Sequence, residues 1–243
     1  MKPKIPYQPF LLRFLHGLTG CFLLLAMASA FWTYNTYDGR WGKLPLPRFE
    51  QIEGIHGTFG LYTLLIFPAL VLYAFGRGHQ RLGQPKSLLQ LTHQVGTPKW
   101  WYTLSRCVNT VSLLALTFAL FSGKMMDEKW LPQGDLEQFW YYAHLVSWLV
   151  MAVAIAMHLL MNAKVGGTPF LLSMLQWQYR PQDSPKLWKK HMAAWWSKRH
   201  PISGIDLINV AARRSALEIL IWFSLIAAWT ISIAKELSDM SLA

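Results

Sequence analysis

The chain has 243 residues, of which 53% are hydrophobic and only 14% charged, and it contains 13 tryptophans. This composition excludes an ordinary soluble domain and indicates an integral membrane protein. The net charge of +11 does not indicate nucleic-acid binding, because lysine and arginine in cytoplasmic loops are expected beside anionic lipid headgroups.

The apolar residues gather in runs long enough to cross a hydrocarbon layer of about 30 Å as helices. The first run, residues 10–34, follows a basic start as a signal peptide does, but it is long and aromatic-rich, so we expect it to be retained. Three further runs cover residues 52–75, 103–123 and 139–163, and a fifth covers residues 216–234. The sequence therefore predicts an all-α integral membrane protein: a four-helix transmembrane bundle with a fifth transmembrane helix.

This pattern divides the chain into three parts. We expect residues 1–165 to form the four-helix core, residues 166–212 an amphipathic loop, and residues 213–243 the fifth helix with a tail. In the loop, tryptophans alternate with lysine and arginine, which is typical of a segment that lies in the plane of the lipid headgroups. The alternative for this loop is a docking surface for a soluble subunit.

Charge predicts the orientation of the spans. If the N-terminus is cytoplasmic, 17 of the 23 lysine and arginine residues fall on the cytoplasmic side. We therefore expect a multi-pass protein with its N-terminus inside, in a cell inner membrane or another energy-transducing membrane. Cys21 and Cys107 both fall within spans and indicate no disulfide framework, and without a CxxCH motif covalently attached haem is not indicated.

Four histidines inside the spans form the main pattern. His144 and His158 stand fourteen residues apart in one run, which is about 40° short of four helical turns and about 21 Å along the axis. They therefore leave the same helix face at opposite depths of the membrane. His16 and His56 lie at matching depths in the first two spans, so we expect His16 to pair with His158 near the cytoplasmic face and His56 with His144 near the outer face.

Two imidazole pairs fit two haems whose axial positions are both filled, which favours electron transfer over gas binding. His16 and His56 each begin an HGxxG repeat, at residues 16–20 and 56–60. The distal glycine shares the face of its histidine, where a flat ring can approach the backbone. Close helix packing is the alternative role for the glycines, and helix-to-helix hydrogen bonding for the histidines. The glycines assigned to the cofactor are Gly17, Gly20, Gly57 and Gly60.

Three polar residues near the cytoplasmic ends of the spans are candidates for contacts with a cofactor. Arg13, one turn before His16, is a candidate for a haem propionate, because guanidinium matches carboxylate geometry. Arg106 and Asn109 on the third span are candidates for a propionate or a quinone headgroup. Snorkelling to lipid phosphate or helix capping is the alternative for all three. The remaining histidines, which we expect at the surface, are His79, His93, His191 and His200.

With one histidine on each of the first two spans and two on the fourth, the chain resembles the prokaryotic cytochrome b561 superfamily over about residues 13–196. Within it, the chain is most similar to the di-haem cytochrome b (gamma) subunits of formate dehydrogenases and nickel-iron hydrogenases. The resemblance implies two haem b groups with quinone as an exchangeable substrate, and it implies these axial ligands: His16, His56, His144 and His158. The fifth span and the long inner loop depart from the four-span core of this family.

We therefore expect a transmembrane di-haem b-type cytochrome of a respiratory chain that transfers electrons between a redox partner and the membrane quinone pool. An electron-transfer subunit of an oxidoreductase is favoured over a stand-alone enzyme, and its expected partners are membrane lipid, quinone and a protein redox partner or larger membrane complex. Two alternatives stay open: a stand-alone superoxide:quinone oxidoreductase, and a haem-free structural or assembly subunit. A divalent-metal transporter is disfavoured, because carboxylates are nearly absent from the spans that carry the histidines.

Overall fold

The computed structural model describes residues 6–84, 88–126, 136, 138–197 and 216–241. Five of its helices are long and apolar enough to cross a membrane, so the protein is an all-helical, multi-pass membrane protein. These helices are α1 (Phe10–Tyr37), α2 (Ile52–Gly76), α5 (Pro98–Met125), α6 (Phe139–Ser173) and α9 (Ala216–Ser241). Shorter elements join them: η1 (His79–Arg81), α4 (Gln90–His93), η3 (Pro181–Asp183), η4 (Pro185–Leu187) and α7 (Trp188–Ser197).

Several helix boundaries differ from those that the apolar runs predict, among them the start of α5 and the ends of α6 and α9. Helix α5 begins at Pro98 rather than at residue 103, because Thr97 caps it: the Thr97 hydroxyl accepts a hydrogen bond from the Trp100 backbone nitrogen at 3.3 Å. Helix α6 runs on to Ser173, ten residues past 163, across a non-helical residue at Gly167 (φ 67°). Residues 168–173, which we placed in the loop of residues 166–212, are therefore helical, and residues 198–212 lie outside the described residues.

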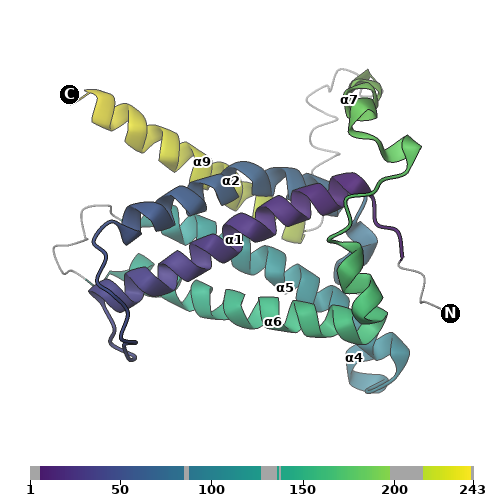
Figure 1. The fold of residues 1–243 in the computed structure, drawn as a ribbon, viewed down its shortest axis with the longest axis horizontal. Helices are drawn as coiled ribbons and strands as arrows, with labels where there is room; N and C mark the ends of the chain where they lie inside the picture. The colour runs from purple at the N-terminus through teal and green to yellow at the C-terminus, as the bar shows by residue number, and fades with distance from the viewer. Residues whose placement is uncertain (1–5, 85–87, 127–135, 137, 198–215, 242–243) are drawn as a thin grey trace.

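The helices form two hairpins that face each other. Helix α1 packs along α2, and α5 packs along α6, and these are the most extensive helix contacts among the described residues. Figure 1 shows α1 and α2 lying side by side, with α5 and α6 forming a second pair beside them. Space for a ligand therefore lies between two hairpins rather than inside either one.

Helix α9 is an integral part of this bundle. It packs against α5 and α2 and crosses the bundle obliquely (Figure 1). Ile221 and Leu225 of α9 are 0% and 1% exposed, in one core cluster with Phe67 of α2 and Met151 of α6. Apolar burial of this kind is what fixes a helix in a bundle, so α9 is not an appended tail.

The segment after α6, residues 174–188, is fixed across the start of α1, and we call it the strap. The Asp183 carboxylate accepts hydrogen bonds from the Phe10 backbone nitrogen and the Tyr7 hydroxyl, each at 2.5 Å. The Trp188 ring centroid lies 5.8 Å from that of Phe10. The start of α1, the end of α6 and the strap therefore meet at one end of the bundle, which also holds Arg13, Arg81 and Arg106 and which we call the basic end.

Candidate functional site

Two histidine pairs bridge the hairpins. The ring centroids of His16 on α1 and His158 on α6 are 5.9 Å apart, with an interplanar angle of 28°. Those of His56 on α2 and His144 on α6 are also 5.9 Å apart, with an angle of 60°. A metal-bound imidazole nitrogen lies about 2 Å from the metal and its ring centroid about 1 Å further, so two rings that share one ion stand about 6 Å apart. Both pairs have the separation that a shared metal requires.

Backbone carbonyls hold the rings of one pair. Nδ1 of His56 donates to the Ala26 carbonyl on α1 at 2.9 Å, and Nδ1 of His144 donates to the Ala119 carbonyl on α5 at 3.1 Å. Because a carbonyl can only accept, Nδ1 of each ring carries the proton and Nε2 keeps its lone pair. This tautomer is the one that a metal ligand needs, and the hydrogen bond raises its basicity.

A side chain plays the same part for His158. Nδ1 of His158 lies 3.0 Å from Oδ1 of Asn109 on α5, and Nδ2 of Asn109 donates to the Arg81 carbonyl at 2.9 Å. The Arg81 carbonyl fixes the orientation of the amide, so the amide oxygen faces His158 and Nδ1 of the ring is the donor. Within the described residues His16 has no such acceptor. Asn109, a candidate for contact with a propionate or quinone, thus contacts the ring of His158.

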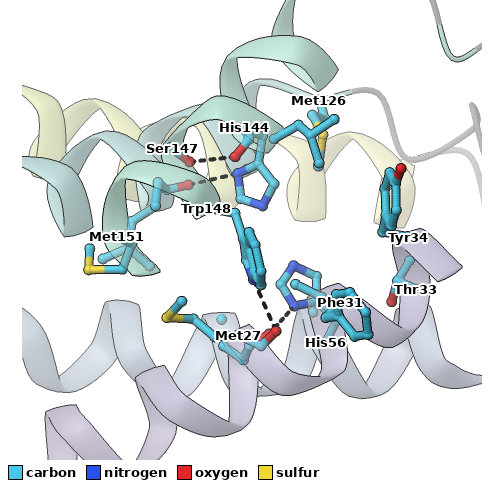
Figure 2. Close-up of a pocket in the computed structure, with 18 of the residues that line it drawn as sticks. Met27, Phe31, Thr33, Tyr34, His56, Met126, His144, Ser147, Trp148 and Met151 are labelled. Carbon is cyan, nitrogen blue, oxygen red and sulfur yellow. Dashed lines mark hydrogen bonds between the residues drawn. The ribbon is translucent and has the colours of Figure 1, made fainter. Parts of the chain in front are cut away.

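A cavity surrounds the pair at the opposite end of the bundle. Its volume is about 580 Å³, within the range of small-molecule and cofactor sites. Figure 2 shows the Trp148 side chain reaching from α6 to α1, where Nε1 donates to the Met27 carbonyl at 3.0 Å. The Phe31 ring stacks against the Trp148 ring, with 6.1 Å between the two ring centroids. The residues of this cavity that bear most on a cofactor are His56, Gly57, Gly60, His144, Trp148 and Met151.

Open space lies beside the glycines of the HGxxG repeats. A Cβ built on Gly17, Gly20, Gly57 or Gly60 would meet no atom within 4 Å. This result argues against close helix packing at these residues, and Gly57 and Gly60 also line the cavity around His56 and His144. Gly123 on α5, which the sequence analysis did not select, differs because its Cβ would lie 3.1 Å from Cε1 of His144, so it lets the ring approach α5.

The two candidate arginines also have partners within the chain. Arg13 is 4% exposed, and its terminal nitrogens donate to the carbonyls of Gln176 and Gln178 in the strap. Its Nε is buried with no hydrogen-bond partner among the described residues. Arg106 donates through Nε to the Leu82 carbonyl at 2.9 Å. Arg13 therefore fixes the strap and keeps one donor for a further acceptor, such as a carboxylate.

The other histidines take no part in these pairs. His79, His93 and His191 are exposed, as expected for surface residues, and His200 lies outside the described residues. No group of three or more histidine, cysteine, aspartate or glutamate side chains is arranged to hold a metal ion in the described part of the chain. The two imidazole pairs are therefore suited to a metal whose remaining ligands come from a cofactor.

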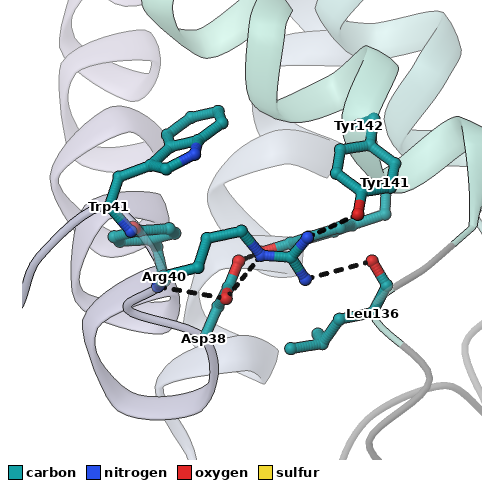
Figure 3. A network of polar contacts seen from close by, with 7 residues as sticks. Asp38, Arg40, Trp41, Leu136, Tyr141 and Tyr142 are labelled. Carbon is teal, nitrogen blue, oxygen red and sulfur yellow. Dashed lines mark hydrogen bonds and ion pairs between the residues drawn. The ribbon is translucent and has the colours of Figure 1, made fainter.

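Figure 3 shows a polar network that the sequence did not predict. Two of its members, Asp38 and Tyr141, line the cavity. Asp38, after α1, pairs with Arg40 at 2.9 Å and accepts from the Tyr141 hydroxyl at 2.5 Å. Arg40 also donates to the Tyr142 hydroxyl at 2.5 Å. Burial alone raises the pKa of the Asp38 carboxyl, but hydrogen bonds from Tyr141 and Arg40 outweigh it, so the pKa is lowered.

Comparison with known proteins agrees with this arrangement. The family model described as prokaryotic cytochrome b561 matches residues 7–177. The match covers α1 to α6 with their histidine pairs and ends before α7 and α9. Among the curated proteins and among the solved structures, nothing matches.

Proposed function

Because the chain belongs to the prokaryotic cytochrome b561 family, which is one of transmembrane b-type cytochromes, we propose that it conducts electrons across a membrane through two haem b groups. The observation that carries the proposal is the pair of 5.9 Å imidazole separations. His16 and His158 hold one group at the basic end, and His56 and His144 hold the other.

The surroundings of the rings support the same function. Haem bound between two imidazoles supplies a one-electron couple without an open coordination position. The glycines of the HGxxG repeats leave room for it, and Trp148 with Phe31 keeps the cavity wall apolar. At the basic end, the buried Nε of Arg13 is free to meet a propionate, and Arg106 stands nearby on α5 as a second candidate. The chain thus binds and orients the cofactor, and it excludes water.

The proposal extends to the partners that exchange electrons with the protein at each face of the membrane. We propose that electrons pass between a protein redox partner and the membrane quinone pool, with quinone reacting close to one of the two histidine pairs. The chain would then be the cytochrome b subunit of a larger oxidoreductase of the formate dehydrogenase or hydrogenase type. We also propose that the basic end faces the cytoplasm, because the lysines and arginines concentrate in the segments at that end.

The direct test is a haem count. Pyridine-haemochrome analysis of the purified full chain is expected to give two haem b per chain. His158→Ala and His56→Ala each remove one imidazole of a pair and are each expected to lose one haem. His191→Ala, at an exposed histidine of α7, is the matched control and keeps both. A colourless wild-type preparation refutes the proposal.

A further inference from the structure

A chain of hydrogen bonds connects the loop after α2 to the ring of His158. The Gln8 side chain, 5% exposed, accepts from Nη2 of Arg81 at 2.8 Å. The Arg81 carbonyl accepts from Nδ2 of Asn109 at 2.9 Å, and Oδ1 of Asn109 faces Nδ1 of His158 at 3.0 Å. Three segments that are distant in sequence therefore meet at Asn109, which contacts the imidazole directly, and Gln8 holds the side chain of Arg81.

Asn109 differs from the acceptors of the other pair. His56 and His144 donate to backbone carbonyls, and the Ser122 hydroxyl also lies 3.1 Å from Nδ1 of His144. The acceptor for His158 is a side-chain amide, and the Arg81 carbonyl fixes its orientation. Because Oδ1 and Nδ2 both have partners within the chain, the role that fits Asn109 is support of the histidine rather than contact with a diffusing ligand.

We propose that Asn109 is a positioning residue that sets the orientation and donor strength of His158, and thereby the reduction potential of the haem at the basic end. The inference rests on the proposed function. A hydrogen bond from Nδ1 to an acceptor raises the basicity of the imidazole. A more basic axial ligand stabilises ferric over ferrous iron and lowers the potential, which hydrogen bonding around the cofactor tunes.

The experiment is a redox titration of the full-length protein in detergent, followed through the haem absorbance. Asn109→Leu removes the acceptor and is expected to shift one of the two midpoint potentials upward. Asn109→Asp replaces the amide oxygen by a carboxylate, which is a stronger acceptor, and is expected to shift the same potential downward. The second potential stays at its wild-type value in both variants.

Asn162→Leu is the matched control. Asn162 is also an asparagine beside His158, but its Nδ2 donates to the His158 backbone carbonyl at 2.7 Å and not to the ring. Both potentials are expected to remain unchanged. Because Asn162→Leu removes a contact within α6 but leaves the imidazole unchanged, this control distinguishes an effect on the ring from a general destabilisation of α6.

The outcomes divide clearly. If Asn109→Leu keeps both haems and both wild-type potentials, the inference is wrong while the proposed function stands. Shifts of the same sign in Asn109→Leu and Asn109→Asp also overturn it, because they indicate a structural effect. If Asn109→Leu does not accumulate, the direction of the Asn109→Asp shift decides alone. A haem-free wild type overturns the inference together with the proposed function.

Discussion

The groups behind the four imidazoles differ from one histidine to the next. His56 and His144 donate to carbonyls of neighbouring helices, His158 donates to Asn109, and His16 has no acceptor among the described residues. Because the partner of Nδ1 influences the donor strength of the ligand, the two proposed haems are not equivalent. We expect two separate reduction potentials, which gives electrons a preferred direction along the bundle.

Gly60 provides a test at the scale of one residue. It lines the cavity around His56 and His144, and its missing side chain leaves open space. Gly60→Leu is expected to fill that space and to lose one of two haems. Helix propensity favours the substitution by up to about 1 kcal/mol, so a weakened helix does not explain the loss. The measurement is the haem-to-protein ratio.

Gly76→Leu is the control for Gly60. Gly76 lies at the exposed end of the same helix, and a Cβ there also meets no atom within 4 Å. The control is expected to keep both haems. Retention of both haems by Gly60→Leu would show that a cofactor does not occupy this side of the cavity.

For single residues, the sequence predicts those positions that the periodicity of a helix determines. The fourteen-residue spacing on α6 fixes the relative directions of His144 and His158, and counting along the spans fixes the depths of His16 and His56. The contact of Asn109 with His158 depends on how α5 and α6 are aligned with each other, and spacing along one helix carries no information about that. The same holds for Gly123, which is recognisable only once α6 is placed beside α5.

The helices themselves were predictable in existence and order, but less so at their ends. The apolar runs identify the starts of α1, α2, α6 and α9, because lipid-facing helices need continuous apolar sequence. The start of α5 and the end of α6 lie outside the apolar runs: Thr97 caps α5 at its start, and α6 continues past the kink at Gly167. The strap is the clearest case: its contacts through Arg13 and Asp183 are long-range, and an amphipathic pattern does not reveal them.

The network around Asp38 predicts a pH effect on the junction between α1 and α6. A carboxyl whose pKa is lower in the folded than in the unfolded protein stabilises the fold above its unfolded pKa, and that contribution disappears as the pH falls through the folded pKa. Asp38→Asn is therefore expected to lower the melting temperature by a few degrees at pH 7. The difference from wild type is expected to shrink below about pH 4, the ordinary range of a carboxyl pKa, and to vanish only once the pH is below the lowered pKa of folded Asp38.

Glu50→Gln is the control for this measurement, because Glu50 is an exposed carboxylate near the same end of the bundle. It is expected to leave the melting temperature unchanged at both pH values. A deficit of Asp38→Asn that persists equally at low pH would show that packing, and not the charge of Asp38, stabilises this junction.

The whole molecule combines two features: a space between the hairpins that admits cofactors, and a bundle in which the two hairpins remain packed together. The extensive contacts are within the hairpins, α1 with α2 and α5 with α6. Helix α9 contacts α5 and α2, one helix from each hairpin, and Lys235 donates to the Met126 carbonyl at the end of α5 at 2.9 Å. We infer that α9 holds the hairpins together from outside, which leaves the interior to the histidine pairs.

Leu225 tests this role of α9. It is 1% exposed in the core cluster with Phe67 and Leu116, and truncation of such a residue to alanine costs about 2–5 kcal/mol. Leu225→Ala is expected to lower the temperature at which the purified protein releases haem, with both haems still bound before heating. Phe223→Ala, on the same helix at a side chain that is 70% exposed, is expected to match wild type. If the two variants released haem at the same temperature, α9 would not be needed to hold the hairpins together around their cofactors.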